Sequence, residues 1–177
     1  MKASTFWKAV VVDRENFLER FLHTLNESGM RYCLIGGQAV NAYVEPLVTL
    51  DLDIVVAAEG IEPLVRVLSR EFTIKRFPNS INVSARESKL RVQIQTDLRY
   101  LPFLDRAEIR SVLDYDLPVA HVEDVLQGKV WAALDPERRT SKKLKDLTDI
   151  ARLIETSSKL RERVPAEVLK KIDSLTW

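Results

Sequence analysis

The sequence contains few of the residues that mark specialised classes of protein. Its 177 residues include a single cysteine, Cys33, which excludes an internal disulfide framework and a cysteine-rich zinc site. Cys33 stands inside an apolar run, and this favours a buried thiol over a reactive one. The formal net charge is only +1. The chain therefore has no excess of charge that would draw it to nucleic acid or to a membrane surface.

Long apolar runs are also missing. No stretch approaches the roughly 20 apolar residues that a membrane-spanning helix needs. Residues 1–12 are too few, and too interrupted by Lys2 and Lys8, for a signal peptide. We therefore expect a cytoplasmic location, by default, and no membrane partner. His23 and His121 are isolated in the sequence, so neither has the spacing of a metal site or a catalytic triad.

The composition is that of an ordinary globular protein. Hydrophobic residues make up 46% of the chain and charged residues 30%. A chain of this length can bury a sizeable core and is most simply one domain. The natural division falls near Pro118. We expect an α/β (α+β) core over residues 1–117 and a helical portion over 118–177, packed together as one compact unit.

Apolar periodicity predicts the order of the elements. An amphipathic helix over 17–25, capped by Asp13 and stopped by Gly29, opens the chain. Segments 81–85 and 90–96 flank a polar turn and can form a hairpin. The other expected strands are 30–35, 50–57, 72–76, 110–113 and 117–120, and the other expected helices are 38–43, one beginning near Pro63, 100–107, 122–134, 141–155 and 165–175.

The most informative stretch joins a glycine pair to a pair of aspartates. Gly36 and Gly37 end an apolar strand, and N–H groups at a helix start after such a turn form an anion site. Asp51 and Asp53 project from one face of the next strand, about 7 Å apart. Two like charges would be very costly in a core. A hard divalent cation such as Mg²⁺ is the simplest resident beside them.

A phosphate chain over the glycines, with metal held by the aspartates, is the arrangement used for in-line phosphoryl or nucleotidyl transfer. Thirteen residues separate Gly37 from Asp51. Each half of the pattern is weak alone, because glycine turns are common and an Asp-x-Asp at a strand end is often a solvated edge. A structural domain without a site is the plain alternative.

The order Gly-Gly, then Asp-x-Asp within an apolar strand, resembles the signature of the polymerase-beta-like nucleotidyltransferase superfamily. Segments 35–40 and 48–54 look most like the branch that contains AbiEii-type toxins and uncharacterised bacterial nucleotidyltransferases. Lys145, Asp146 and Asp149 are similar to its late Lys/Asp helix. The resemblance spans roughly residues 17–155. It implies a nucleotidyltransferase-like twisted mixed β-sheet flanked by helices, with a helical C-terminal part.

The resemblance also implies a chemistry and its partners. These are Mg²⁺ (or Mn²⁺), a nucleoside triphosphate as donor, a hydroxyl acceptor in RNA or protein, and an antitoxin if the chain is the toxin of a toxin–antitoxin pair. Carried over by position, Asp51 and Asp53 are the metal ligands, and together with Gln93 they are the catalytic residues. The implied nucleotide-binding residues are Gly36, Gly37, Gln38, Thr49, Lys129 and Lys145.

Two positions depart from the family pattern. Leu47 stands where an arginine is common, two residues before Thr49. Gln93 stands where a third carboxylate is expected. Its amide oxygen can reach a metal, but it adds no negative charge and cannot take a proton. Asp97 has the same strand parity and is an alternative carboxylate. A nucleotide-binding or partner-binding module without catalysis therefore stands beside the enzyme as a second hypothesis.

Several late residues have a plainer interpretation. Lys129 can be a solvated helix lysine, and Lys145 with Asp149 can be a surface pair at i,i+4 spacing. Trp7 and Trp131 are expected to serve packing. A short basic cluster can meet an RNA acceptor or be a solvated loop. The members of that cluster are Arg138, Arg139, Lys142, Lys143 and Lys145.

Overall fold

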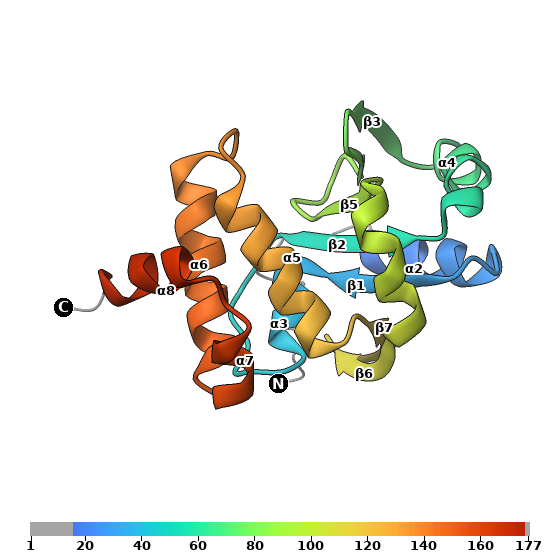
Figure 1. Ribbon diagram of the computed structural model, residues 1–177. Coiled ribbons are helices and arrows are strands. Elements are labelled where there is room, and N and C mark those ends of the chain that lie inside the picture. The colour runs from blue at the N-terminus through green and yellow to red at the C-terminus, as the bar shows by residue number, and fades with distance from the viewer. Residues whose placement is uncertain (1–15, 176–177) are drawn as a thin grey trace.

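A mixed seven-stranded sheet, in the order β3-β4-β5-β2-β1-β7-β6, forms the centre of the computed structural model, which describes residues 16–175 (Figure 1). The β2–β5 and β1–β7 pairs are parallel, and the other pairs are antiparallel. The β4–β5 pair confirms the predicted hairpin. The strands are β1 (Tyr32–Ile35), β2 (Asp51–Val56), β3 (Thr73–Phe77), β4 (Ser80–Ser84), β5 (Arg91–Gln95), β6 (Glu108–Val112) and β7 (Tyr115–Val119).

Helices cover both faces of this sheet. In Figure 1, α5 crosses in front of the sheet, α2 lies behind it, and α6, α7 and α8 gather at one end. The arrangement confirms the twisted mixed sheet with flanking helices and a helical C-terminal part. The helices are α2 (Phe17–Glu27), α3 (Gly36–Asn41), α4 (Ile61–Leu68), α5 (Val122–Leu134), α6 (Thr140–Ile154), α7 (Ser158–Glu162) and α8 (Ala166–Asp173), with 3₁₀ segments η1 (Ala58–Gly60) and η2 (Leu98–Arg106).

Local patterns account for most of these elements. The first predicted helix is α2, and the five apolar residues of its predicted face are all buried: Phe17, Leu18, Phe21, Leu22 and Leu25. Gly29 follows the helix with φ +66°. The predicted cap at Asp13 lies outside the described residues. The segment predicted as a helix over 100–107 is the 3₁₀ helix η2, which contains Pro102. Proline cannot donate an intrahelical hydrogen bond, which suits a short and irregular helix. Helix α7 was not predicted.

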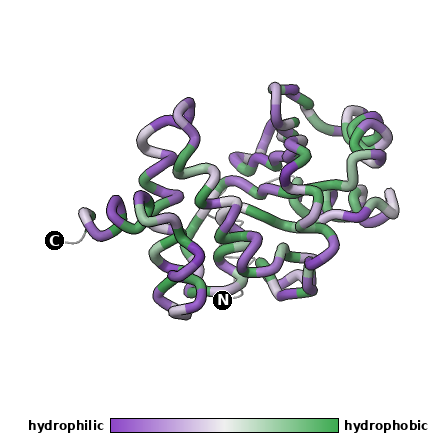
Figure 2. The backbone as a smooth tube through the Cα atoms, in the orientation of Figure 1, coloured by the Kyte–Doolittle hydropathy of each residue, from purple (hydrophilic) through white to green (hydrophobic). Residues whose placement is uncertain are grey.

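One hydrophobic core runs from Phe17 in α2 to Ile172 in α8. In Figure 2, hydrophobic stretches occur in the central strands, and hydrophobic and hydrophilic residues alternate along the helices. Strand β2 buries Leu52 and Ile54 completely on one face, which leaves its aspartates on the other. Cys33 is also fully buried, as expected, and burial raises the pKa of its thiol to about 12.

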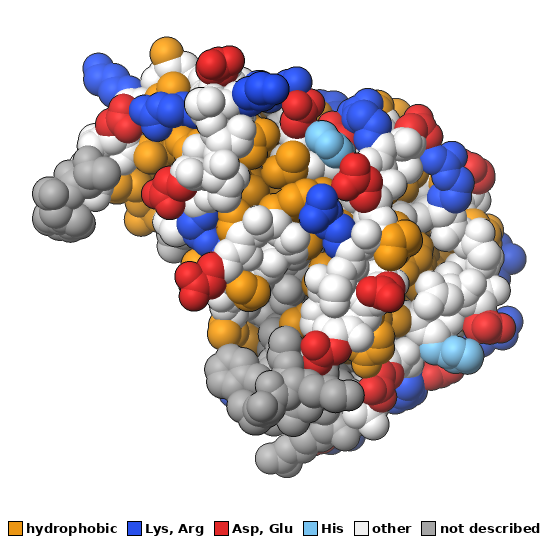
Figure 3. Space-filling view, turned by 90° about the horizontal axis from the view of Figure 1, so that it is seen from below, with side chains coloured by type: hydrophobic (Ala, Val, Ile, Leu, Met, Phe, Trp, Pro, Cys, Tyr) orange, Lys and Arg blue, Asp and Glu red, His pale blue; other side chains and the backbone are white. Residues whose placement is uncertain are grey.

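The surface carries charges of both signs. On the face seen in Figure 3, basic and acidic side chains are interspersed around apolar areas over its described part. Within residues 16–175, no helix is both long enough and apolar enough to cross a membrane. Pro118, where the sequence suggests a division, lies inside β7, and β7 pairs with β1 of the sheet.

Candidate active site

Strand β2 places two acidic side chains beside β5 in a fixed register. Asp53 lies opposite Gln93, and Asp51 lies opposite Arg91. The parallel pairing puts side chains of the same parity on the same face of the sheet. Gln93 is therefore the immediate neighbour of Asp53, in the place where the family resemblance leads one to expect a third carboxylate.

The glycine turn packs directly against this pair. Ile35 is the cross-strand partner of Asp53, and the next residue, Gly36, begins α3 with φ +68°. A Cβ atom at Gly36 would lie 2.9 Å from Asp53 Cγ. Both the backbone conformation and the close approach therefore require glycine at this position.

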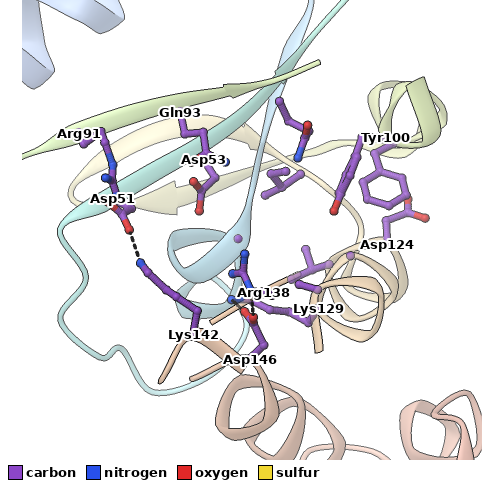
Figure 4. A pocket seen from close by; sticks show the side chains of 17 residues that line it. Asp51, Asp53, Arg91, Gln93, Tyr100, Asp124, Lys129, Arg138, Lys142 and Asp146 are labelled. Atoms are coloured by element: carbon purple, nitrogen blue, oxygen red, sulfur yellow. Dashed lines mark hydrogen bonds and ion pairs between the residues drawn. The ribbon is translucent and has the colours of Figure 1, made fainter. Parts of the chain in front are cut away.

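A cavity of about 190 Å³ lies between this face of the sheet and helices α5 and α6. Figure 4 shows side chains from the strands on one side of the cavity and from the helices on the other. Five of the predicted site residues line the cavity: Gly36, Asp51, Asp53, Gln93 and Lys129. The other polar residues that line it are Arg91, Gln95, Tyr100, Asp124, Arg138, Lys142 and Asp146.

The remaining predicted residues lie elsewhere. Gly37, Thr49 and Lys145 line a second cavity of about 120 Å³. Lys145 Nζ donates to Thr49 Oγ1 at 3.1 Å. Gln38 lines neither cavity and is only 1% exposed, and its Oε1 accepts from Asn41 Nδ2 at 3.3 Å. Of the six predicted nucleotide-binding residues, two thus line the first cavity, three line the second and one lines neither.

Lys129 is held between two carboxylates of α6. Its Nζ lies 3.0 Å from Asp146 Oδ1 and 2.7 Å from Asp149 Oδ2. Burial alone would lower the pKa of Lys129, but the two carboxylates outweigh burial and raise it. Arg138 Nε completes the network at 2.5 Å from Asp146. The interpretation of Lys129 as a solvated lysine is therefore wrong.

The surface pair considered for Lys145 and Asp149 is also absent. Asp149 is buried and pairs with Lys129 and with Arg152, whose Nη1 is 2.9 Å from Asp149 Oδ1. An i,i+4 spacing predicts proximity on a helix but not the direction in which each side chain points. Here Asp149 points into the protein and Lys145 points toward Thr49.

The two aspartates of β2 have opposite electrostatic surroundings. Burial raises the pKa of Asp51, but the nearby Arg91 and Lys142 outweigh it and hold that pKa below its usual value. Burial, with a contribution from Asp51, raises the pKa of Asp53 to about 6. Titratable neighbours whose pKa values are pushed apart are typical of functional sites.

The donor set beside Gly36 fits a divalent cation. Among the described residues, none donates a hydrogen bond to the Asp53 carboxylate, although it lies in the cavity wall. The Gln93 amide and the Asp51 carboxylate supply further oxygens on the same face. Mg²⁺ prefers oxygen ligands and commonly uses only one or two carboxylates, with waters and phosphates in its other positions. Groups of three or more His, Cys, Asp or Glu residues placed to hold a metal do not occur within residues 16–175.

Three cationic side chains of the cavity were not predicted for this site: Arg91, Arg138 and Lys142. Arg91 Nη2 lies 2.7 Å from Asp51 Oδ1, and Lys142 Nζ lies 3.2 Å from Asp51 Oδ2 (Figure 4). Arg91 stands two residues before Gln93 in the same strand, so strand parity was a signal that could have found it. Lys142 and Arg138 appeared only as members of the basic cluster. Their side chains line the cavity, so these two residues do not belong to a solvated loop, and a contact with an RNA acceptor stays a prediction.

Asp97 does not take the place of the third carboxylate. Strand β5 ends at Gln95, and Asp97 caps η2 by accepting from Arg99 N at 3.0 Å. Its carboxylate also pairs with the Arg99 side chain at 2.7 Å, and it does not line the cavity. Trp131 packs face to face with Phe103 at 5.8 Å between ring centroids, which confirms its expected packing role.

The sheet, the glycine turn and the paired aspartates define a nucleotidyltransferase-like fold. The solved structure of ANT(2")-Ia in complex with adenylyl-2"-tobramycin matches with a TM-score of 0.60 at 11% identity, over 87% of this chain and 95% of that one. The lincosamide antibiotic adenylyltransferase LnuA, lincomycin-bound, matches with a TM-score of 0.55 at 16% identity, over 78% and 97%. A putative nucleotidyltransferase from Thermotoga maritima matches with a TM-score of 0.51 at 12% identity, over 79% and 91%.

Within this fold, the sequence points to one family. The model of the AbiEii family, described as nucleotidyl transferase AbiEii toxin of a type IV toxin–antitoxin system, matches residues 48–174. The chain belongs to this family. No curated protein matches the sequence. The family assignment confirms the resemblance drawn from segments 35–40 and 48–54 and identifies the chain as a nucleotidyltransferase-family protein.

Proposed function

We propose that the protein transfers a nucleotide from a nucleoside triphosphate to a hydroxyl of RNA or protein, with Mg²⁺ or Mn²⁺ as cofactor. Asp51 and Asp53 would hold the metal, with Gln93 beside them. When bound, the metal neutralises phosphate charge and orients the triphosphate. The acceptor oxygen would form a bond to the α-phosphorus as the bond to pyrophosphate breaks, and pyrophosphate would leave.

The residues of the chain would act as follows. Gly36 lets the phosphates approach the backbone because it carries no side chain over Asp53. Lys142 and Arg138 line the opposite wall and would neutralise the triphosphate. Gln93 can accept or donate a hydrogen bond but cannot take the proton of the attacking hydroxyl. That proton would pass to water or to Asp53.

One observation carries this proposal. The Asp53 carboxylate receives no hydrogen bond from any described residue, although it stands in a cavity wall with Gln93 next to it and Gly36 packed against it. A structural carboxylate at a partly buried position is usually hydrogen-bonded to the protein. A cation-binding role explains the unpaired oxygens, the close approach of Gly36 to Asp53 and the neighbouring basic side chains together.

The alternative is a nucleotide-binding or partner-binding module that has lost catalysis. Gln93 favours it, because the third carboxylate is absent at the very position that lies against Asp53. The variant Gln93→Asp separates the two. Restoring a carboxylate should raise the transfer rate of an enzyme that is slow for lack of a proton acceptor, whereas a pure binding module should remain inactive.

The test begins with thermal unfolding in the presence of Mg²⁺ or Mn²⁺ and each of the four nucleoside triphosphates. A ligand at 100 times its Kd should stabilise the protein by about 2.7 kcal/mol. The wild-type protein should be stabilised by a metal–nucleotide pair, and Asp51→Asn and Asp53→Asn should not. If no pair shifts the unfolding temperature of the wild-type protein, the proposed nucleotide site does not exist.

Transfer itself requires a second measurement. Incubation with α-labelled triphosphate and either total RNA or a cell lysate should label an acceptor, and the label should be lost in Asp53→Asn. A toxin role, with an antitoxin as partner, would appear as growth arrest on induction that the same substitution relieves. Binding without any labelled product would favour the binding module instead.

A further inference from the structure

Both carboxylate oxygens of Asp51 are occupied by side-chain cations. Arg91 of β5 takes Oδ1 at 2.7 Å, and Lys142 of α6 takes Oδ2 at 3.2 Å. Asp53, the other aspartate of β2, has no such partner among the described residues. The two members of the metal-binding pair therefore differ: one is open to a cation and the other is already neutralised by the protein.

The two cations on Asp51 are free to change partners. Their side chains are 43% and 34% exposed, whereas Lys129 is 8% exposed and locked between Asp146 and Asp149. A long side chain at a partly exposed site can move to a new anion at little cost, because exposed ion pairs contribute little to stability. Lys142 lies in the first turn of α6, on the helical wall that faces the sheet across the cavity (Figure 4).

Arg91 also carries a donor that lacks an acceptor. Its Nε is buried and has no hydrogen-bond partner within residues 16–175. Buried donors in folded proteins are nearly always paired, so an orphaned guanidinium N–H beside a cavity points to a missing anionic ligand. The same guanidinium that pairs with Asp51 thus has unused capacity for an oxygen such as that of a phosphate.

We propose that Lys142 and Arg91 exchange partners, holding Asp51 in the free protein and the triphosphate in the loaded one, so that metal and nucleotide bind with strong positive coupling. This inference rests on the proposed function and concerns the regulation of the same site. A metal that binds alone must displace Arg91 and Lys142 from the Asp51 carboxylate, and both side chains are then left without an anionic partner. A nucleotide that binds alone must compete with Asp51 for these two cations, and its phosphates are repelled by the carboxylates of Asp51 and Asp53. When both bind, each displaced charge finds a new partner.

Coupling of this kind is measurable and reciprocal. If nucleotide raises the affinity for metal by a given factor, metal must raise the affinity for nucleotide by the same factor. Such factors are typically about 5–150-fold. Direct contact between metal and phosphate will contribute to the factor in any variant. The part assigned to the exchange is the difference between variants that keep the charge at position 142 and variants that lose it.

The experiment measures Mn²⁺ binding to the full chain by electron paramagnetic resonance, with and without an α,β-methylene nucleoside triphosphate that cannot be transferred. Lys142→Gln should bind Mn²⁺ alone about two- to fivefold more tightly than wild type, because the competing ammonium is gone. Its coupling factor should fall several-fold. Lys142→Arg, which keeps the charge, should retain most of the wild-type coupling.

A matched control comes from the neighbouring residue. Lys143→Gln removes the same charge from the same helix, and Lys143 makes no ion pair among the described residues. It should leave both the Mn²⁺ affinity and the coupling unchanged. Arg91→Gln provides a second variant, with the same direction of change as Lys142→Gln, if the latter should unfold.

The outcomes separate this inference from the proposed function. Wild-type binding of Mn²⁺ and nucleotide with a coupling factor that Lys142→Gln leaves intact would overturn the exchange while the nucleotide site stands. A drop in Lys143→Gln equal to that in Lys142→Gln would also overturn it, because the effect would then be one of net charge. Failure of the wild-type protein to bind any metal–nucleotide pair would overturn both proposals.

Discussion

At the scale of single residues, Gly36 and Gly29 make a natural pair for comparison. Both have φ near the left-handed region, +68° and +66°, but a Cβ at Gly36 would lie 2.9 Å from Asp53 Cγ, whereas a Cβ at Gly29 would meet nothing within 4 Å. A side chain would therefore cause the same backbone strain at either position. The steric clash with the candidate metal ligand belongs to Gly36 alone.

We predict that Gly29→Ala lowers the free energy of unfolding by about 1–2 kcal/mol, the cost of a left-handed alanine. Gly36→Ala should cost more than this, and it alone should abolish the stabilisation by metal and nucleotide. Urea unfolding gives the first quantity and thermal shift with Mn²⁺ and triphosphate gives the second. Equal ligand-induced shifts in the two variants would show that the approach of Gly36 to Asp53 has no role in binding.

The pKa of Asp53 gives a prediction about pH. Burial raises this pKa from the usual 3.8 to about 6. The folded protein then binds more protons than the unfolded chain between about pH 4 and pH 6. The free energy of unfolding must therefore fall as the pH rises through that window, and the loss persists above it. Two pKa units correspond to about 3 kcal/mol.

Asp53→Asn should remove this loss in metal-free protein. We expect the variant to be more stable than wild type at pH 7 by on the order of 2 kcal/mol, and the difference to vanish near pH 4. Urea unfolding in a chelator at a series of pH values measures it. A variant that is no more stable than wild type at pH 7 would contradict the raised pKa of this partly buried, unpaired carboxylate. Asp53→Asn should therefore be more stable than wild type but no longer bind metal and nucleotide. Such a trade-off between stability and activity is expected of a functional residue.

At the scale of elements, the helices α5 and α6 are joined by a buried ion-pair network. Lys129, on α5, reaches two α6 carboxylates that are 2% and 4% exposed. Removal of one partner from a buried pair commonly costs 3–5 kcal/mol, because an uncompensated charge is left inside. Here Arg138 and Arg152 remain beside those carboxylates and soften the loss.

We predict that Lys129→Met lowers the free energy of unfolding by about 3 kcal/mol, at the lower end of that range. Lys159→Met, at an exposed position of α7, should change it by less than about 0.5 kcal/mol. The double variant Lys129→Met with Asp149→Asn should be less destabilised than the sum of the single variants, because the second change removes one uncompensated charge. An additive double variant would mean that Lys129 and Asp149 do not interact.

The sequence was most informative about the helices and strands. The apolar stripe of α2 and the alternation in β2 and β5 are local patterns, and each was recovered to within a few residues. Strand parity placed Asp51 and Asp53 on one face. The family resemblance placed Gln93 in the motif, and only the sheet register set it against Asp53. Side chains share a face at a period of two in strands and of 3.6 in helices. The strand period was enough to place both aspartates of β2 on one face.

The missed parts of the site depend on distant contacts. Lys142 lies 91 residues from Asp51 in the sequence, and no periodicity relates them. Lys129 was expected near a phosphate or in solvent, whereas the packing of α5 on α6 buries it between carboxylates. Thr49 and Lys145 proved to line a neighbouring cavity. Each of these results follows from how the helices dock on the sheet, which local propensity does not determine.

At the scale of the whole molecule, the cavity has two walls of different origin. The sheet supplies Asp51, Asp53 and Gln93, and the C-terminal helices supply Lys129 and Lys142. The division expected near Pro118 would separate these walls. The core is nonetheless continuous from Phe17 to Ile172, and β7 carries residues from both sides of the division.

We therefore predict that the protein unfolds in one cooperative transition. Calorimetric and van't Hoff enthalpies should agree, as they do for a two-state domain. A fragment of residues 1–120 lacks α5, and with it the buried side chains that Val125, Leu126 and Val130 contribute to the core. Such a fragment should fail to show cooperative unfolding or to bind Mn²⁺ with triphosphate.

The competing expectation is a core that folds alone and recruits the helical portion as a separate unit. It predicts two calorimetric transitions, and a fragment with dispersed amide resonances and its own unfolding midpoint. Burial argues against it. A sheet face that loses its covering helix exposes apolar area at a cost of about 25 cal/mol per Å². A few hundred Å² would then offset most of the 5–15 kcal/mol by which a domain is normally stable. A cooperative fragment would show that the site is assembled from two independently stable parts.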